Sequence, residues 1–172
     1  MDNDQKNGYG IIEILIASSI GVILFLSVNS FLNLSLKIAI DDMHKVEALN
    51  LARATLEGAR ALRDEDKPSP DPDPKLGWNE ISGLTFDAPH HFEAAGAGPY
   101  DWTPIAGNQA VGRYTVWFTV SQVQRANFGI GDIVSGGGTL DPNTIKITSN
   151  VTWTSSKGSE QISLYEYLTN IK

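Results

Sequence analysis

The hydrophobic pattern begins with a long stretch that has no polar side. From Gly8 to Leu36 the chain is mostly apolar, and the 23 positions from Ile14 to Leu36 carry no charge. A helix of that length is roughly 35 Å long, which is enough to cross a hydrocarbon core of about 30 Å. Glu13 stands near the start of the run, where a carboxylate is costly and is read as functional. We therefore predict a transmembrane helix over residues 9–40.

After Lys37 the same helical pattern becomes one-sided. Apolar residues recur at three- and four-residue steps, as expected for an amphipathic helix that covers a core. The stripe comprises Leu49, Ala52, Leu56, Ala59 and Leu62/Arg63, and the opposite side carries Asn50, Arg53, Glu57 and Arg60. The spacing also predicts ion pairs Arg53–Glu57 and Arg60–Asp64. Both parts together predict one helix that ends near residue 64 and is roughly 80 Å long.

Three later segments alternate with period two, which predicts β-strands with one apolar face. The inward sets are Tyr114, Val116, Phe118 and Val120, then Ile145, Ile147, Val151 and Trp153, and finally Ile162, Leu164 and Leu168, with Tyr165 and Tyr167 outward. The short turn at Lys157 and Gly158 predicts that the last two strands form an antiparallel hairpin. The sheet needs a cover for its apolar face, and the helical stripe is the candidate.

The predicted fold class is α+β, with the long N-terminal helix packed on a small antiparallel sheet of three to four strands. The predicted organisation is a leader over 1–8, a transmembrane and assembly helix over 9–40, and a globular domain over 41–172. Within that domain we expect helix at 41–64, loops at 65–111 and the sheet at 112–170. One short strand is expected near His91 to Ala94. Four prolines between positions 68 and 74 exclude helix in the acidic segment that they occupy.

The composition of the chain argues against several classes of function. The net charge is −7 and the 13 basic residues are scattered, so strong nucleic-acid binding is not expected. The chain has no cysteine, which excludes disulfides and thiolate sites. No catalytic motif occurs, and we predict that the protein is not an enzyme and needs no cofactor.

Two clusters invite a metal-site interpretation without supporting it. In the stretch from His90 to Glu93 the two histidines, His90 and His91, are adjacent and would diverge in a strand, and no third ligand is placed by spacing; we interpret the stretch as part of a surface loop. Gly129, Gly131 and Asp132, together with Asp141 and the Pro-Asn pair that follows it, lie in turns that leave a loop calcium site open, although the spacing of an EF-hand is absent. We predict no metal site.

The N-terminal residues resemble the prepilin motif of type IV pilins and type II secretion pseudopilins. A short polar stub ends at Gly8, Tyr9 follows, and Glu13 stands five positions after the glycine, in the stretch GYGIIEILIA. The order of long helix, loop and C-terminal sheet also resembles this family. The leader, with Asp2 and Asp4 against Lys6, departs from the basic leaders of the family.

The resemblance implies how the residues act. A prepilin peptidase would cut between Gly8 and Tyr9, and Tyr9 would become a new, commonly methylated N-terminus. Glu13 would pair with that amine in its own or a neighbouring subunit, because a buried carboxylate needs a cation or a proton. Cofactors are not implied. The implied partners are further copies of the chain, other pilins, the peptidase and the pilus assembly machinery.

The implied location is the cytoplasmic membrane before assembly and an extracellular pilus or periplasmic pseudopilus afterwards. The function expected first is a structural subunit of a type IV pilus-like filament, or fimbrium. A minor pilin or pseudopilin of a secretion or competence system is the alternative. It is supported by Ser30, where many type IVa pilins have proline, and by the missing cysteines. A membrane-anchored binding module that does not polymerise is the remaining alternative.

Overall fold

A computed structural model of the chain describes residues 5–64, 76–94, 102–126 and 131–170, and for residues 5–9, 76 and 94 it describes the backbone alone. The chain divides into two compact units, Met1–His44 (unit 1) and Lys45–Lys172 (unit 2). The predicted acidic segment at 68–74 lies outside the described residues, as do residues 1–4 of the predicted leader. The boundaries predicted for the leader and the transmembrane segment remain predictions.

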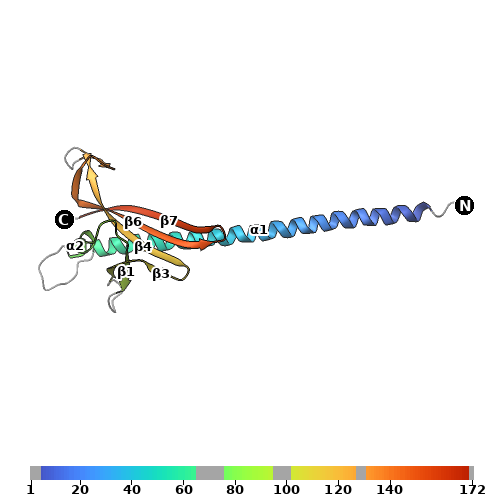
Figure 1. Ribbon diagram of the computed structural model, residues 1–172, viewed down its shortest axis with the longest axis horizontal. Coiled ribbons are helices and arrows are strands. Elements are labelled where there is room, and N and C mark those ends of the chain that lie inside the picture. The colour runs from blue at the N-terminus through green and yellow to red at the C-terminus, as the bar shows by residue number, and fades with distance from the viewer. Residues whose placement is uncertain (1–4, 65–75, 95–101, 127–130, 171–172) are drawn as a thin grey trace. The chain divides into compact units, whose positions relative to one another are not determined.

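Helix α1 (Gln5–Asp64) supplies all of the described part of unit 1 and enters unit 2 (Figure 1). By length and composition it can cross a membrane. Four polar side chains within the apolar part donate hydrogen bonds to the helix's own carbonyls. Ser18 donates to Leu15 O at 3.0 Å, Ser19 to Ile16 O at 2.8 Å, Ser27 to Ile23 O at 2.7 Å and Asn29 to Phe25 O at 2.9 Å. These bonds satisfy a donor of each of these four side chains without water.

Unit 2 combines the end of α1 with a short helix and one antiparallel sheet. The elements after α1 are α2 (Leu76–Ser82), β1 (His90–Ala94), β2 (Trp102–Ala106), β3 (Gln109–Val111), β4 (Tyr114–Arg125), β5 (Ile133–Val134), β6 (Thr139–Ser155) and β7 (Gly158–Thr169). The strand order is β2-β1-β4-β6-β7, and β3 and β5 also pair with β4. Strands β6 and β7 form the predicted hairpin, in which Ser155 faces Gly158 and Thr144 faces Thr169.

The core lies between α1 and one face of the sheet. Ala59 and Leu62 of α1 are buried against Phe118 and Ile147. A second cluster, nearer the start of unit 2, joins Ala48 and Ala52 of α1 to Tyr114, Val116, Val151 and Trp153. The predicted apolar faces of β4, β6 and β7 and the helical stripe that covers them are therefore confirmed. Figure 1 shows β4, β6 and β7 along the end of α1.

The expected strand number is wrong, because the part of the chain that the structure describes contributes seven strands to the sheet and not three to four. The segment predicted as loops, 65–111, contains α2, the predicted short strand β1, and also β2 and β3. These strands have five, five and three residues, too few for a period-two pattern to stand out. Their pairing with each other and with the edge of β4 holds them extended. Their existence thus depends on tertiary partners.

The ion pairs of α1 also differ from the spacing rule. Arg60 does not use Asp64; it donates to Glu57 at 2.5 Å and to Glu166 of β7 at 2.7 Å. Asp64 instead accepts from Arg63 at 2.6 Å. The cross-element pair with Glu166 exists only because α1 lies on the sheet, which sequence spacing could not foresee.

Candidate functional site

The three residues singled out by the N-terminal motif lie on consecutive turns of α1. Gly8, Tyr9 and Glu13 all fall within the helix, which begins at Gln5. Tyr9 and Glu13 are four residues apart, so they lie on the same side of the helix with about 6 Å of rise between them. A helix that includes Gly8 is locally weak there, because glycine is a poor helix former.

The surroundings of Glu13 are apolar on every side of the helix. The large apolar side chains from Ile11 to Ile40 are all exposed, by 50% to 69% of their surface. Among the residues whose side chains are described, Glu13 has no hydrogen-bond or ion-pair partner, whereas Ser18, Ser19 and Ser27 bond to carbonyls of the same helix. A carboxylate in such a segment needs a proton or a cation once the segment leaves water.

The arrangement can bind a cation that arrives from outside the described side chains. A positive group one helical turn before Glu13, or one brought by a neighbouring helix, would lie within reach of the carboxylate. Tyr9 has the position for the first case, because cleavage of the peptide bond before it would create an amine there. Among Gly8, Tyr9 and Glu13, the one described side chain that carries an acid or base is that of Glu13. No catalytic chemistry follows from a single carboxylate.

The histidine cluster is part of the sheet, so its interpretation as a surface loop is wrong. His90 and His91 belong to β1, and neighbouring residues of a strand point to opposite faces. His90 is buried, its Nδ1 lies 2.9 Å from Ala88 O, and its ring centroid lies 5.8 Å from that of Phe118. In His91, Nδ1 lies 3.2 Å from Gly107 O and Nε2 lies 3.2 Å from Glu93 Oε1. Within the described residues, no three His, Asp or Glu side chains are grouped as metal ligands.

The acidic turn that left a calcium site open is occupied by an arginine. Arg125 Nε donates to Asp141 Oδ2 at 2.6 Å, and its Nη1 donates to Gly131 O at 3.3 Å. Burial alone would raise the pKa of Asp141, but hydrogen bonds from Arg125, Thr144 and the backbone of Asn143 hold it below its ordinary value. The guanidinium already supplies the positive charge that a calcium ion would bring.

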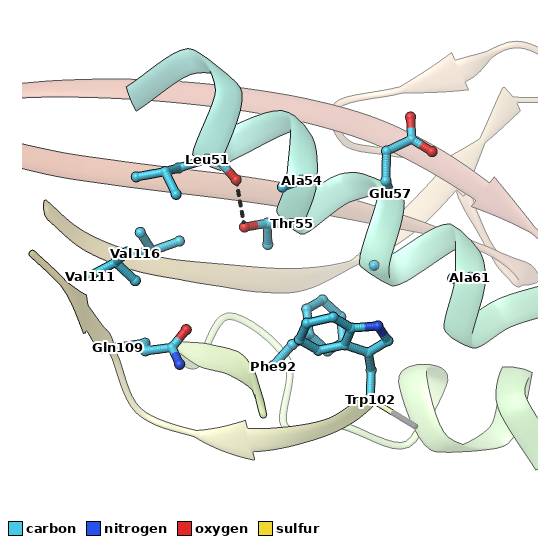
Figure 2. Close-up of a pocket in the computed structure, with 11 residues that line it drawn as sticks. Leu51, Ala54, Thr55, Glu57, Ala61, Phe92, Trp102, Gln109, Val111 and Val116 are labelled. Carbon is cyan, nitrogen blue, oxygen red and sulfur yellow. Dashed lines mark hydrogen bonds between the residues drawn. The ribbon is translucent and has the colours of Figure 1, made fainter. Parts of the chain in front are cut away.

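A groove that the sequence analysis did not anticipate lies between α1 and strands β1 to β4 (Figure 2). Its volume is about 500 Å³. Leu51, Val111 and Val116 lie at one end, and Phe92 and Trp102 at the other (Figure 2). The polar groups in its lining do not converge as they would in an active site. Thr55 donates to Leu51 O within the helix at 3.0 Å, and Glu57 accepts from Arg60.

Small residues on α1 open this groove. Ala54, Gly58 and Ala61 recur at four and three positions, so they lie on one face of the helix. A Cβ at Gly58 would come within 3.3 Å of the Phe92 ring, so glycine allows the ring to pack close to the helix. The small-residue spacing was a visible signal in the sequence. The facing wall was not, because Phe92 and Trp102 belong to a segment predicted to be mostly loop.

Comparison of the chain with protein-family models, with curated proteins and with solved structures gives no significant match in any of the three.

Proposed function

We propose that this chain is a pilin-like structural subunit, held in a membrane by α1 and polymerised through the same helix after cleavage between Gly8 and Tyr9. The observation that carries the proposal is the all-round apolar exposure of α1 from Ile11 to Ile40, interrupted by one carboxylate at Glu13. A helix of this kind needs a bilayer or other helices around it. Repetition of one head-to-tail contact that does not close into a ring gives a filament.

In this proposal Glu13 fixes the axial position of α1 against the α1 helix of a neighbouring subunit. The neighbouring subunit's α1 would cover the apolar surface without favouring one axial position, because apolar side chains pack in many registers. A carboxylate that must meet an amine fixes the position. Ser18, Ser19 and Ser27 do not compete for this role, because their hydroxyls already bond to their own helix.

The decisive experiment has two parts. Edman sequencing of the full chain, expressed with a prepilin peptidase, should begin at Tyr9, and Gly8→Val should leave Met1 as the first residue. Glu13→Ala should abolish or strongly reduce sheared filaments seen by electron microscopy, while the circular dichroism of unit 2 is retained. Glu57→Ala, which removes an exposed carboxylate of unit 2, is the matched control and should assemble normally. A wild-type chain that begins at Met1 after exposure to the peptidase, or filaments from Glu13→Ala equal to wild type, would contradict the proposal.

A minor pilin or pseudopilin is the second candidate, favoured by the unbroken course of α1. The helix runs from Gln5 to Asp64 through Ser30, with no interruption where a proline would soften it. Both candidates share the cleavage site and Glu13, so mutations there cannot separate them. Quantitative mass spectrometry of isolated filaments can: a major subunit dominates the filament mass, whereas a minor one occurs at a few copies.

A further inference from the structure

The face of the sheet that points away from α1, here called the outer face, carries an ordered array of uncharged polar and aromatic side chains together with one lysine, Lys146. Strand register places its members in four rows across β4, β6 and β7. The rows are Thr115–Thr152–Gln161, Trp117–Asn150–Ser163, Thr119–Thr148–Tyr165 and Ser121–Lys146–Tyr167. Cross-strand neighbours in such rows lie close enough to act on one ligand.

Two exposed tyrosines form a corner at one end of this face. The centroids of Tyr165 and Tyr167 are 5.9 Å apart and their rings are inclined at 77°. They are 62% and 39% exposed, so both rings present apolar surface to solvent. Lys146 Nζ lies 4.5 Å from the Tyr165 ring centroid, so a cation–π contact holds the ammonium at the corner. A ring inserted there would meet one tyrosine by its face and the other by its edge.

The amides of the outer face that lie one and two rows from Tyr165 are already oriented. Asn150 Oδ1 accepts from Ser163 Oγ at 2.7 Å and from Gln161 Nε2 at 3.1 Å, and Asn150 Nδ2 donates to Thr148 O at 3.3 Å. Asn150 is 8% exposed although it belongs to the outward row. Polar groups locked in this way lose little side-chain entropy when a ligand binds, which is a property of preorganised sites.

The corner continues into a groove of about 560 Å³. The pairing of β4 and β6 shifts register between Gln122 and Val123, and a bulge of this kind bends a strand pair. Figure 1 shows this end of β4 and β6 turning out of the line of the sheet. The groove is lined by Ser121, Gln122, Val123, Gln124, Ile133, Val134, Ser135, Lys146 and Tyr167. Three of these residues belong to the outer face, so groove and corner are one continuous surface.

The charges of this surface indicate a neutral ligand. Lys146 is the single charged residue among those that line the groove, and at the margin Asp87 accepts a hydrogen bond from Ser121 at 2.5 Å. One cation and one anion do not select a polyanion, and the chain as a whole is acidic. Hydroxyls and amides act as both donors and acceptors, so they match a ligand that is rich in hydroxyl groups. The negative face of a tyrosine ring attracts the partly positive C–H groups of a sugar ring.

We propose that the outer face binds a neutral oligosaccharide of pyranose units, with one sugar ring in the corner of Tyr165 and Tyr167 and the next in the adjoining groove. Lys146 and the uncharged polar side chains that line the groove supply hydrogen bonds to its hydroxyls. The volume of the groove is in the range of ligand sites in proteins. This proposal involves unit 2 alone and does not depend on whether the chain polymerises.

The test uses the full chain in lipid nanodiscs, because maltoside and glucoside detergents carry sugar headgroups of their own. Cellohexaose, maltoheptaose and chitohexaose are the probes, titrated by calorimetry and by NMR of ring-labelled tyrosine. At least one should bind with a dissociation constant of about 0.01–1 mM and shift the signals of Tyr165 and Tyr167. Tyr165→Ala and Tyr167→Ala should each weaken binding about tenfold.

The matched control is Trp102→Ala, which removes an exposed aromatic ring from the groove on the other side of the sheet and should leave binding unchanged. If a variant fails to fold, the shifts of the Tyr165 and Tyr167 signals that sugar causes in the wild-type chain still test the proposal. Three results would overturn the proposal: no binding of any probe at about 10 mM, tighter binding of an anionic heparin hexasaccharide than of every neutral probe, or an equal loss with Trp102→Ala. Tyrosine shifts that depend on protein concentration without sugar would assign the face to a second copy of the chain.

Discussion

Helix α1 contains two stretches of similar secondary structure and opposite exposure. From Ile11 to Ile40, in unit 1, every large apolar side chain is at least half exposed, whereas Ala48, Ala52 and Ala59 in unit 2 are fully buried. The first stretch is apolar all round and small residues are scattered along it. The second is apolar on one side, where its small residues allow the sheet to approach. The difference shows that apolarity alone does not place a helix, because the width of the apolar surface decides what can cover it.

The largest expected difference in unfolding free energy comes from replacing one phenylalanine in each unit. Phe118 is fully buried against α1, and Phe118→Ala should lower the free energy of unfolding of unit 2 by about 3–5 kcal/mol. Phe31→Ala, at a side chain that is 68% exposed in unit 1, should leave that free energy unchanged. Urea unfolding of the full chain in nanodiscs, followed by tryptophan fluorescence, measures both. Equal effects would mean that the two units do not unfold separately.

Enlarging an alanine sharpens the comparison at the helix itself. Ala52 is fully buried beside the sheet, so Ala52→Leu should overpack the core and destabilise unit 2 by about 1–3 kcal/mol. Ala39→Leu in unit 1 adds the same atoms on an exposed side and should have no such effect. The midpoint of thermal unfolding provides the measurement. An unchanged midpoint for Ala52→Leu would show that α1 can move away from the sheet at Ala52 without destabilising unit 2.

The next effect tests a buried hydroxyl that joins α1 to β4. Tyr114 donates to Glu47 Oε2 at 2.7 Å, and burial together with this bond raises the pKa of Tyr114 to about 12. The folded state therefore favours the neutral phenol. Its contribution is fully present below the unfolded pKa of about 10 and is lost as the pH rises through 12.

Tyr114→Phe should accordingly cost about 1 kcal/mol at neutral pH and flatten the decline in stability between about pH 10 and 12. Unfolding free energies measured over that range check both parts. Tyr165→Phe, which alters an exposed phenol, serves as the control and should leave the decline in place. If Tyr114→Phe also leaves it in place, Tyr114 is not the group responsible.

The smallest expected effect has the opposite sign. Ser149 Oγ is buried with no hydrogen-bond partner in the part of the chain that the structure describes, whereas Ser27 in unit 1 bonds to its own helix. Ser149→Ala should stabilise unit 2 by about 0.5–1 kcal/mol, because an unsatisfied buried hydroxyl carries its desolvation cost without compensation. Ser27→Ala should leave the unfolding of unit 2 unchanged. Chemical unfolding resolves the two, and a loss of stability in Ser149→Ala would reveal a partner for the hydroxyl.

Long periodic segments were the predictable part of the fold. The period-two faces of β4, β6 and β7 and the period-3.6 stripe of α1 are each repeated over ten or more residues, so a single exception does not hide them. The strands β1, β2, β3 and β5 were missed or only partly foreseen, because each is too short to show a period. The partner that holds each one extended stands elsewhere in the sequence.

The candidate sites divide in the same way. Gly8, Tyr9 and Glu13 were visible because their meaning depends on spacing along one helix. The apolar groove of Figure 2 and the corner of Tyr165 and Tyr167 were not visible as sites. Each requires side chains from strands or helices that are far apart in the chain, although the outward direction of both tyrosines was correctly predicted.

The sequence by itself thus determined the two characters of α1, the antiparallel hairpin of β6 and β7, and the position of Glu13 within an apolar helix, because these depend on local periodicity and on the cost of burying a charge. The tertiary structure decided the number of strands, the partners of Arg60 and Asp141, the burial of His90 and the shapes of both grooves. These features depend on which side chains meet across the sheet and across α1, and that is set by packing between segments distant in the chain.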